Sequence, residues 1–528
     1  MYRIDSTQTH PLYRVAATRA IEQAAAVGLP PHTLMARAGW AVACLARALA
    51  PHARRIWIAC GSGNNGGDGL VAATHLHQWA QTQAGGPEVL VTHTLQHGPQ
   101  TAPAPPDARW ALAAAQQAGV RFAEQAPEQF DLAIDALLGI GARASPQGVL
   151  AQWLALLRHS SAPLLCVDLP SALDADTGVL AGWPHTTGER APSGPRHTLA
   201  LLTLKPGLFT ADGRDAAGQV WFDPLQTAAA QLPPPCAWLA GRTDGGADRT
   251  GRLHISHKGS QGDVLVLGGQ DMRVDGAGMT GAALLAARAA LHAGAGRVFV
   301  GLLGAPSDAP ALHWDPICPE LMLRTPAALL DSALLSSAAL VCGCGGGASV
   351  AAVLARVLAC APRLVLDADA LNAVAHERPL QTLLQQRGAR GWITVLTPHA
   401  QEAARLLGSS AAAVMADRLL AAHTLAERYA ALCVLKGSGT LIVAPGQTAL
   451  INPSGNAALA SAGTGDVLAG LIGGALAPLG GATMAQALPR VAQAVFQHGW
   501  LADQWGVGLP PLGTLSASRL AAQVRPLA

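Results

Sequence analysis

Near the C-terminus, the sequence GTGD (463–466) places a carboxylate directly after a run of small residues. If this segment opens a helix, the amides of Gly463–Gly465 can bind an anion, and Asp466 can take a proton from a substrate hydroxyl. The same tetrapeptide could instead be a simple helix N-cap. The segments KGSGT (436–440) and DADALN (367–372) favour phosphoryl transfer, because developing phosphoryl charge needs fixed donors.

Lysine is rare in this chain: of 35 Lys and Arg residues, the lysines are Lys205, Lys258 and Lys436. Each lies next to or close to a glycine. An ammonium is a compact and flexible donor, so lysines that remain in an arginine-rich chain are candidates for binding phosphate or another anion. The alternative is that the three positions are chance survivors of codon bias.

A second glycine-rich segment, GSGNNGGDG (61–69), lies between an apolar run typical of a buried strand (55–60) and a pattern that predicts a helix over 69–80. Its glycines match GxGxxG, which alone is weak evidence for a dinucleotide site, and the acid that usually holds the ribose is missing. The two asparagines and Asp68 are more informative. Amide and carboxylate oxygens at a helix N-terminus suggest a hard cation, a phosphate, or both.

Two further strands are predicted to end in carboxylates. FDLAID ends in Asp135, and LLCVDLPS contains Asp168 and Ser171. The carboxyl ends of strands in a doubly wound sheet border one crevice, so these residues can meet Asn65 there. Taken singly, each aspartate could be only a helix cap or a turn former.

The elements that would position these groups are those of an α/β protein. Short apolar strands alternate with alanine-rich helical segments, which is typical of parallel sheets. A chain of 528 residues is too long for one core. The proline run and glycines of 227–249 are typical of a domain boundary, so we expect domains over 1–226 and 250–528 joined by this linker.

Composition excludes several classes of protein. A net charge of +2 gives no sign of nucleic-acid binding, and the N-terminus has no apolar secretory segment, so we expect a cytoplasmic protein. Residues 467–489 carry no charge, but their glycines and proline predict a buried helix and a loop rather than a membrane span. Small residues over 281–290 permit close association, and we expect a homo-oligomer.

The nine cysteines form no CxxC pair and no cluster with histidine. We expect free thiols in a reducing compartment. Cys342 and Cys344 are too few for a structural metal site by themselves. His399 and Glu402 also do not make a zinc site, and fit better as a substrate contact and one oxygen ligand of a water-rich magnesium site.

The segments NNGGDG, IDALLGIG and VDLPSALDADTG, preceded by GLPPHTLMARAG (28–39), resemble the NAD(P)H-hydrate epimerase domain, which has a Rossmann-like fold. The resemblance covers most of residues 10–225. It implies that potassium binds at Asn65, Asp135 and Ser171, and we expect Asp135 and Asp168 to support proton transfer. The positions implied to bind the hydrated nicotinamide nucleotide are Asn64, Asn65, Gly66, Gly67, Asp68, Gly139, Ile140, Gly141, Ala142, Arg143, Ala144, Ser145 and Asp168.

Two positions depart from that family's pattern. Ala36 stands where relatives usually have Glu, and Ala172 stands where they usually have Gly. Lys205 matches a family lysine in a Lys-x-Gly element, although nothing in the sequence explains its role.

The second half resembles the ribokinase-like fold and, within it, the ADP-dependent NAD(P)H-hydrate dehydratase over about 250–520. The resemblance implies that Ala282, Gly345, His399 and Asp466 contact the hydrate. The positions implied to bind the adenine nucleotide are Lys436, Gly437, Ser438, Gly439, Thr440 and Gly465. The chain reads GCGGG (343–347) where the family often reads GPGLG.

Together the two resemblances imply a repair enzyme for damaged nicotinamide cofactors. It would epimerise the R and S forms of NADHX and NADPHX and dehydrate the S form with ADP, using K⁺ in the first domain and Mg²⁺ in the second. Fusion of the two domains favours ADP over ATP, a choice that the loops alone leave open. The alternatives are a vitamin-precursor kinase of ribokinase-like type with an N-terminal nucleotide-binding module, and a non-enzymatic first half.

Overall fold

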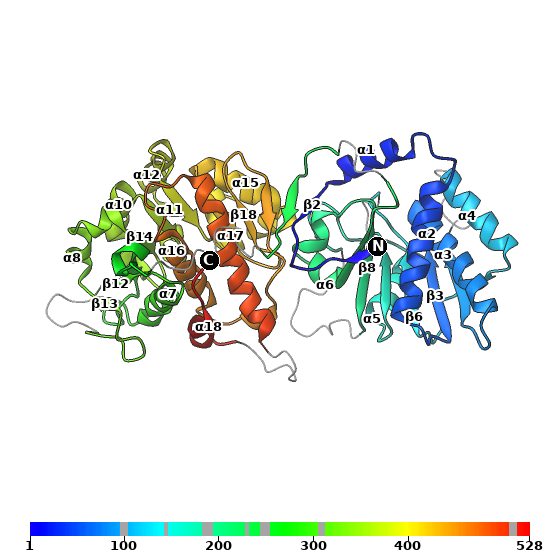
Figure 1. Cartoon of the computed structure of the whole chain (residues 1–528), viewed down its shortest axis with the longest axis horizontal. Helices are drawn as coiled ribbons and strands as arrows, with labels where there is room; N and C mark the ends of the chain where they lie inside the picture. Colours follow the sequence, from blue (N-terminus) through cyan, green and yellow to red (C-terminus); the bar gives the residue numbers. More distant parts are fainter. Residues whose placement is uncertain are drawn as a thin grey trace. The chain divides into compact units, whose positions relative to one another are not determined.

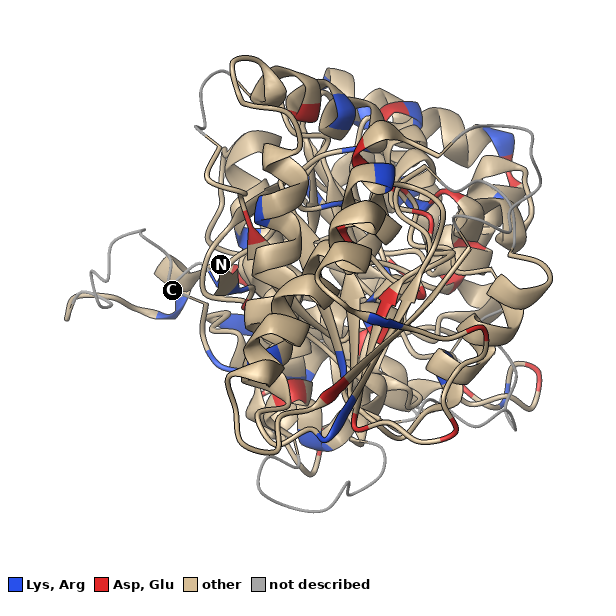
Figure 2. Ribbon diagram, turned by 90° about the vertical axis from the view of Figure 1, so that its right-hand side faces the viewer, with Lys and Arg blue, Asp and Glu red and all other residues tan. Residues whose placement is uncertain are grey.

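The computed structural model describes residues 1–94, 104–141, 146–181, 194–227, 232–242, 254–304, 312–505 and 515–527. These residues form two compact units, Met1–Asp5 with Pro11–Ala237 and Ser6–His10 with Trp238–Ala528 (Figure 1). Each unit contains a sheet with helices packed on it, and this confirms the predicted α/β class. In the view of Figure 2, basic and acidic residues are interspersed along the described elements, consistent with a net charge of +2.

The sheet of the first unit has eight strands in the order β1-β9-β8-β7-β6-β3-β4-β5. The strands are β1 (Tyr2–Arg3), β3 (Arg55–Cys60), β4 (Glu88–His93), β5 (Arg121–Phe122), β6 (Leu132–Ala136), β7 (Leu164–Val167), β8 (Arg196–Leu201) and β9 (Gln219–Asp223). All neighbours are parallel except β1 and β9. The chain runs outward from β3 in one direction and from β6 in the other. Their carboxyl ends therefore border the crevice in which doubly wound sheets bind ligands.

Helices cover both faces of this sheet because alternate residues of β3 point to opposite sides. Ile56 and Ile58 pack in one core with α2 (Thr33–Leu49) and α3 (Asn64–Gln81), whereas Trp57 packs in another. The remaining helices are α1 (Val15–Ala26), α4 (Pro106–Gln117), α5 (Val149–His159), η1 (Pro206–Phe209) and α6 (Gly213–Ala217). The predicted strand 55–60 is confirmed.

A second sheet, which contains the parallel strands of the second unit, has eleven strands in the order β13-β12-β11-β14-β15-β16-β17-β18-β19-β10-β2. The strands are β2 (His10–Leu12), β10 (Ala237–Leu239), β11 (Asp263–Gly268), β12 (Arg297–Leu302), β13 (Met322–Leu323), β14 (Ala339–Cys342), β15 (Arg363–Leu366), β16 (Ile393–Leu396), β17 (Leu432–Leu435), β18 (Leu441–Val443) and β19 (Ala449–Ile451). Strands β13 to β17 are parallel, and β18 and β19 continue antiparallel. The strand order reverses between β11 and β14, which again predicts a binding crevice. Strand β10 lies within the segment 227–249, which we expected to be a linker.

The helices of the second unit pack on both faces of its sheet. They are η2 (Lys258–Gln261), α7 (Thr280–His292), α8 (Pro326–Leu330), α9 (Leu334–Ser337), η3 (Gly347–Val350), α10 (Ala351–Cys360), α11 (Asp369–His376), α12 (Arg378–Ala389), α13 (Ala400–Leu407), α14 (Ala411–Ala416), α15 (Arg418–Tyr429), η4 (Ala457–Leu459), α16 (Thr464–Leu476), α17 (Met484–Gln504) and α18 (Ala517–Gln523).

Helix α16 is the buried centre of the second unit. A side chain on Gly470 would clash with the backbone of Ala286, so α16 and α7 approach closely. The buried small residues of α7 therefore pack within their own unit, and they give no support to the association for which we considered them. A buried helix and a loop were predicted over 467–489, and α16 with the loop before α17 confirms them. Among the described residues, no helix is long and apolar enough to cross a membrane.

Candidate active sites

The glycine segment of the first unit belongs largely to a helix. Helix α3 begins at Asn64, so the predicted start at residue 69 is wrong by five residues. A side-chain carbon on Gly66 would lie 1.9 Å from the carbonyl oxygen of Gly61, and one on Gly61 would lie 1.8 Å from that of Leu137. These glycines let the first turn of α3 lie directly against the ends of β3 and β6. They serve close packing rather than an open loop.

Asp135, at the end of β6, is fully buried and well supplied with donors. Ser171 donates from its backbone N to Asp135 Oδ2 at 3.0 Å and from its Oγ to Oδ1 at 2.6 Å. The backbone N of Leu137 donates to Oδ1 at 3.2 Å. Burial raises the pKa of Asp135, and the hydrogen bonds from Ser171 and Leu137 oppose that rise. The carboxylate is therefore held in one orientation and retains little free acceptor capacity.

Asn65 lies in the first turn of α3, next to the same loop. A side-chain carbon on Gly139 would be 3.2 Å from the Cβ of Asn65. The next residue back, Leu138, donates its backbone N to Ser171 Oγ at 2.9 Å. The Nδ2 atom of Asn65 is buried and has no hydrogen-bond partner within the described ranges. The three residues expected to hold potassium thus gather around one loop, and their amide, carboxylate and hydroxyl oxygens are chemically suited to a hard cation.

Asp168 has a different partner. It follows β7 with a φ of 65°, and its Oδ1 accepts from the backbone N of Leu201 at 3.0 Å and from Lys205 Nζ. The Lys205 ammonium also donates to the carbonyl oxygen of Leu201 at 2.9 Å, and 1% of its side chain is exposed. Lys205 therefore forms a buried ion pair with one of the predicted catalytic residues, and this accounts for a lysine that the sequence left unexplained.

Asp168 acts electrostatically on two other carboxylates. Burial raises the pKa of Asp68 well above its usual range, and repulsion from Asp168 and Glu22 adds to the rise. Burial and Asp168 also raise the pKa of Glu22, whereas Lys205 lowers it. Glu22 lies on α1, which the sequence offered no reason to place at the site.

The structure describes only part of the loop expected to bind the nucleotide. Gly139 lies beside Asn65, whereas Ile140 is partly exposed and Gly141 is exposed. The predicted contacts Ala142, Arg143, Ala144 and Ser145 lie outside the described residues.

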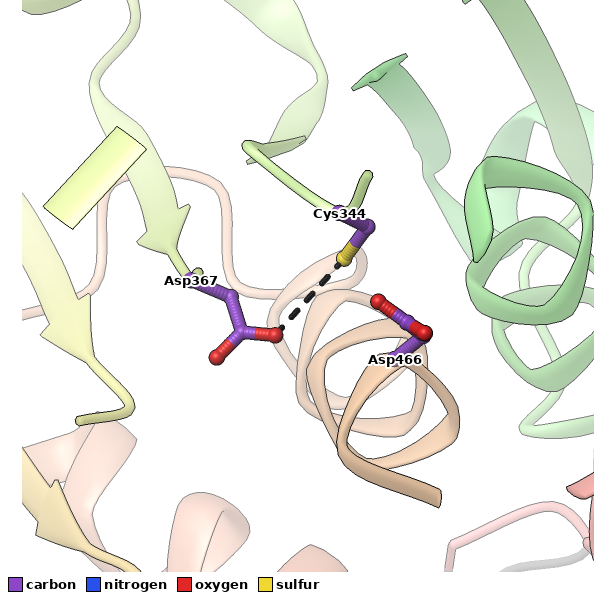
Figure 3. Close-up of side chains that lie close together, drawn as sticks. All are labelled: Cys344, Asp367 and Asp466. Atoms are coloured by element: carbon purple, nitrogen blue, oxygen red, sulfur yellow. Dashed lines mark hydrogen bonds between the residues drawn. The ribbon is translucent and has the colours of Figure 1, made fainter. Parts of the chain in front are cut away.

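In the second unit, Asp466 lies in the first turn of α16 and faces two other polar side chains (Figure 3). Atoms of Cys344, Asp367 and Asp466 that could share one cation all lie within 4.8 Å of one another. Burial raises the pKa of Asp466 to about 6, and the negative charge of Asp367 adds to the rise. Asp466 can therefore change its protonation state near neutral pH, as an acid–base group must.

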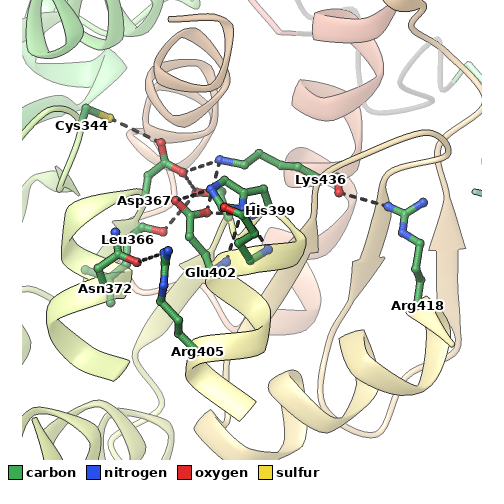
Figure 4. Close-up of polar contacts among 11 residues, drawn as sticks. Cys344, Leu366, Asp367, Asn372, His399, Glu402, Arg405, Arg418 and Lys436 are labelled. Carbon is green, nitrogen blue, oxygen red and sulfur yellow. Dashed lines mark hydrogen bonds and ion pairs between the residues drawn. The ribbon is translucent and has the colours of Figure 1, made fainter. Parts of the chain in front are cut away.

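Lys436 connects this cluster to the next strand ends (Figure 4). Its Nζ donates to Asp367 Oδ1 at 2.8 Å and lies 4.0 Å from Glu402 Oε2. Burial would lower the pKa of Lys436, but Asp367 and Glu402 outweigh it and raise the pKa. A side-chain carbon on Gly465 would be 3.4 Å from this Nζ, so the two predicted nucleotide-binding residues meet.

His399 and Glu402 form a capping box at the start of α13. Glu402 Oε2 accepts from the backbone N of His399 at 2.8 Å, and His399 Nδ1 accepts from the backbone N of Gln401 at 3.1 Å. Glu402 is 4% exposed, whereas 46% of the His399 side chain is exposed. The imidazole is thus available to a ligand. The Glu402 carboxylate is occupied by the cap and by Lys436, so it is less suited to the magnesium role expected of it.

The segment 436–440 is held by an arginine that the sequence did not single out. Arg418 is 2% exposed, and its guanidinium donates to the carbonyl oxygens of Leu435 at 3.2 Å, of Lys436 at 3.1 Å and of Ser438. Such a rigid support fits a loop that must present backbone groups to a ligand. Thr440 Oγ1 donates to the carbonyl oxygen of Gly437 at 3.1 Å, and Gly437 and Gly439 have φ of 139° and 62°.

The last two predicted substrate contacts, Ala282 and Gly345, touch each other. Gly345 has a φ of 57°, and a side chain on it would lie 2.8 Å from the Cβ of Ala282. Gly345 directly follows Cys344 in the chain. Every predicted residue of the second unit thus lies at the carboxyl ends of its strands or on the helices that begin there.

His498 is a third residue that the sequence did not single out, after Glu22 and Arg418. Its Nε2 donates to the carbonyl oxygen of Thr464 at 2.8 Å and so supports the first turn of α16. Burial lowers the pKa of His498 to about 4, so the imidazole is neutral near pH 7. No pattern around residue 498 indicates this role, because the contact joins residues 34 positions apart.

Two family models match the chain. That of the NAD(P)H-hydrate dehydratase matches residues 264–511, and that of the YjeF-related protein N-terminus matches residues 31–207. The bifunctional NAD(P)H-hydrate repair enzyme of Escherichia coli K12 is 36% identical over 471 residues, which cover 86% of this chain and 82% of that protein. The chain belongs to the family of bifunctional NAD(P)H-hydrate repair enzymes.

Two other members of this NAD(P)H-hydrate repair group are similarly related. The bifunctional enzyme of Coxiella burnetii is 34% identical over 507 residues, covering 93% of this chain and 94% of that protein. The ADP-dependent (S)-NAD(P)H-hydrate dehydratase of Neisseria meningitidis serogroup B is 37% identical over 281 residues, covering 52% of this chain and 87% of that protein. The Neisseria meningitidis protein is thus similar to only about half of this chain, over most of its own length.

The departures from the repair-family pattern have structural consequences. Ala172 follows Ser171 with a φ of 70°, a conformation that favours glycine, so the residue present is strained. Ala36 lines a pocket of about 730 Å³ in the first unit, together with His32, Trp40, His75 and Trp110. Ala36, where the resemblance leads us to expect a glutamate, therefore borders open space.

Proposed function

We propose that the first unit interconverts the R and S forms of NADHX and NADPHX, and that the second unit dehydrates the S form at the expense of ADP. The observation that carries the proposal is the environment of Asp466. This carboxyl lies at the N-terminus of α16, with a pKa of about 6, beside Lys436 and Gly465. The names of the relatives from Escherichia coli and Neisseria meningitidis support the same pair of reactions.

Dehydration requires a better leaving group than hydroxide. Transfer of the terminal phosphate of ADP to the C6 hydroxyl, with release of AMP, would provide one, and Asp466 would accept the hydroxyl proton. The phosphate would then leave C6 while the neighbouring ring carbon loses a proton, which re-forms the double bond. The amides of Gly463–Gly465 would hold the transferring phosphate. Lys436 keeps one donor on Asp367 and can direct others to the same phosphate, because an ammonium has three donors.

The remaining predicted residues would orient the two substrates. Ala282, Gly345 and His399 would contact the hydrate, and the backbone of 437–440, held by Arg418, would bind the adenine nucleotide. Mg²⁺ would accompany ADP and neutralise phosphate charge, bound chiefly through phosphate oxygens and water. Among the described carboxylates near the site, Glu402 is committed to its cap and to Lys436.

In the first unit we assign different roles to the two predicted catalytic aspartates. Asp135, which accepts three hydrogen bonds, would orient the potassium site with Asn65 and Ser171. Asp168, paired with Lys205 and close to Asp68, would support proton transfer to and from the hydrate. K⁺ would supply fixed positive charge near the nucleotide.

The deciding experiment incubates the full chain with separated R and S epimers of NADHX, with ADP, with ATP or with neither nucleotide. We expect NADH to form from the S epimer only with nucleotide and faster with ADP. We expect the R epimer to be consumed through prior conversion to S, with a rate that depends on K⁺. Phosphorylation of a vitamin precursor without NADH formation would instead support the kinase alternative.

Compartment and assembly are proposed on separate grounds. All nine cysteines are free, which supports a reducing compartment such as the cytoplasm. Trp40 and Trp110, 52% and 37% exposed beside the pocket of the first unit, support a homo-oligomer with a contact there. Light scattering of wild type and Trp40→Ser would test the contact, and an unchanged mass would remove it.

A further inference from the structure

The segment GCGGG (343–347) brings a thiol into the second site, at a position where relatives often have proline. Cys344 follows β14 and is completely buried. Its Sγ, a carboxylate oxygen of Asp367 and one of Asp466 all lie within 4.8 Å of one another (Figure 3). The three side chains come from different segments and point toward a common centre.

The two carboxylates turn oxygens toward this thiol. Asp367 Oδ1 accepts from Lys436 at 2.8 Å and from Thr397 Oγ1 at 2.7 Å, whereas Oδ2 faces Cys344 Sγ at 3.9 Å. Asp466 makes no ion pair within the part of the chain that the structure describes. One lysine therefore faces a group of three acids, Asp367, Asp466 and Glu402. The three acids outnumber the one lysine, so the described side chains of this site could carry an excess of negative charge.

We propose that Cys344, Asp367 and Asp466 bind a thiophilic divalent cation of the Zn²⁺ or Cd²⁺ type. A sulfur ligand selects such ions over Mg²⁺, which prefers six oxygen ligands and keeps its water. Zinc bonds to sulfur and oxygen place tetrahedral ligands about 3–4 Å apart, so a small rotation of Asp466 closes the site. On binding, the Cys344 thiol gives its proton to solvent and the thiolate bonds to the metal.

Binding has a consequence for the reaction. A metal-bound Asp466 carboxylate cannot accept the proton of a substrate hydroxyl, so the cation inhibits the dehydratase. This second part rests on the proposed function, whereas binding itself does not. Epimerisation by the first unit uses none of these side chains and should persist in the metal-bound protein.

Cadmium titration of the full chain without nucleotide tests the site directly. Thiolate–cadmium bonds absorb in the ultraviolet, and the seven thiols other than Cys342 and Cys344 give a background common to all variants. Cys342→Ala is the matched control, because Cys342 is equally buried two residues earlier and lies outside the cluster. We expect wild type and Cys342→Ala to show the same band, and Cys344→Ala to lose it.

Half-saturation gives the second measurement. We expect Cys344→Ala to show no such band at about ten times the Cd²⁺ concentration that half-saturates wild type, and Asp466→Asn to keep the band at weakened affinity. Equal titrations of wild type and Cys344→Ala would overturn the proposal. If Cys344→Ala does not fold by circular dichroism, Cys344→Ser takes its place with the same expectation, because a hydroxyl is a poor ligand for Cd²⁺.

Inhibition is measured separately on NADH formation. We expect Cd²⁺ to inhibit wild type and Cys342→Ala alike, and the residual activity of Cys344→Ser to resist about tenfold more Cd²⁺. A wild-type protein that binds Cd²⁺ through Cys344 but never forms NADH would refute the proposed function and leave the cation site established. Equal inhibition of all three proteins would refute the link between this site and the dehydratase.

Discussion

The two units each place an aspartate at the switch point of a parallel sheet, and the hydrogen-bond donors around the two aspartates differ. Asp135 is buried, whereas Asp466 is partly exposed. Asp135 accepts three hydrogen bonds, from Leu137 and from both donors of Ser171. Asp466 has the Cys344 thiol as its neighbour, and burial raises its pKa to about 6. Hydrogen-bond supply therefore separates a carboxylate that is held in place from one that can exchange a proton.

The lysines of the two units also differ in exposure and in their partners. Lys205 is 1% exposed and donates both to Asp168 and to the carbonyl oxygen of Leu201. Lys436 is 20% exposed and faces Asp367 and Glu402. Lys258 is exposed at the start of η2. Two of the three lysines thus stand beside candidate sites, and only Lys436 is open enough to reach a ligand.

Replacing the proton-accepting aspartate should have the largest effect. We expect Asp466→Asn to lower the dehydration rate by about 10²–10⁴-fold, because the amide cannot accept the hydroxyl proton. Epimerisation should be unchanged, since Asp135 and Asp168 are intact. Asp331→Asn is the matched control in the same unit, because 73% of that side chain is exposed. Equal dehydration rates in Asp466→Asn and Asp331→Asn would show that Asp466 is not the proton acceptor, and the proposed difference between Asp135 and Asp466 would be wrong.

The second-largest effect is expected when the ion pair between Lys205 and Asp168 in the first unit is broken. We expect Lys205→Met to lower the free energy of unfolding by about 3 kcal/mol, the low end for a buried pair, because Asp168, whose side chain is 14% exposed, is left without its cation. Lys258→Met, at an exposed lysine, should change it by less than about 0.5 kcal/mol. Denaturant unfolding of both variants measures the difference. A recovery of stability in the double variant Lys205→Met with Asp168→Asn would confirm that the pair is coupled.

Much of the fold could be predicted because strands and turns have local signals. The apolar run 55–60, bounded by charge and glycine, is β3, and the uncharged segment 467–489 contains the end of α16, the loop and the start of α17. The start of α3 was wrong because its glycines read as a loop. Gly66 is required by the backbone of Gly61, and Gly61 by the backbone of Leu137, and the contact with Leu137 is one that no local pattern contains.

The residues of the candidate sites also fall into those that local sequence patterns predicted and those that they did not. Asp135, Asp168 and Asp466 were found because each follows or opens an element with a recognisable pattern. Glu22, Arg418 and His498 were missed because their partners are distant in the chain, and a buried ion pair such as Lys205 with Asp168 joins residues 37 positions apart. Sequence therefore located the residues at the strand ends but not the residues that hold them.

The pH dependence of the dehydration rate should show a smaller effect that also depends on Asp466. The base form of Asp466 exists above its pKa, so kcat/KM should rise with pH up to about 6 and then level off. Below that value the slope should approach about tenfold per pH unit. Asp369→Asn should move the profile to lower pH, because repulsion from Asp369 raises the pKa of Asp466. The control Asp331→Asn should leave it in place, and a profile that is flat between pH 5 and 8 would exclude Asp466 as the base.

The smallest effect is expected at Ala172, in the loop that holds the first unit's aspartate. A φ of 70° costs an alanine about 1–2 kcal/mol, and glycine would relieve this strain. Part of the stabilisation is lost, however, because glycine gives the unfolded chain more conformational freedom than alanine does. We therefore expect Ala172→Gly to raise the free energy of unfolding by about 0.5–1 kcal/mol. Ala430→Gly, at a φ of 47° in the second unit, should do the same, and thermal unfolding measures both. Only Ala172→Gly should alter the K⁺ dependence of epimerisation, because Ser171 next to it donates twice to Asp135. If both variants left that dependence unchanged, the strain at Ala172 would concern stability alone.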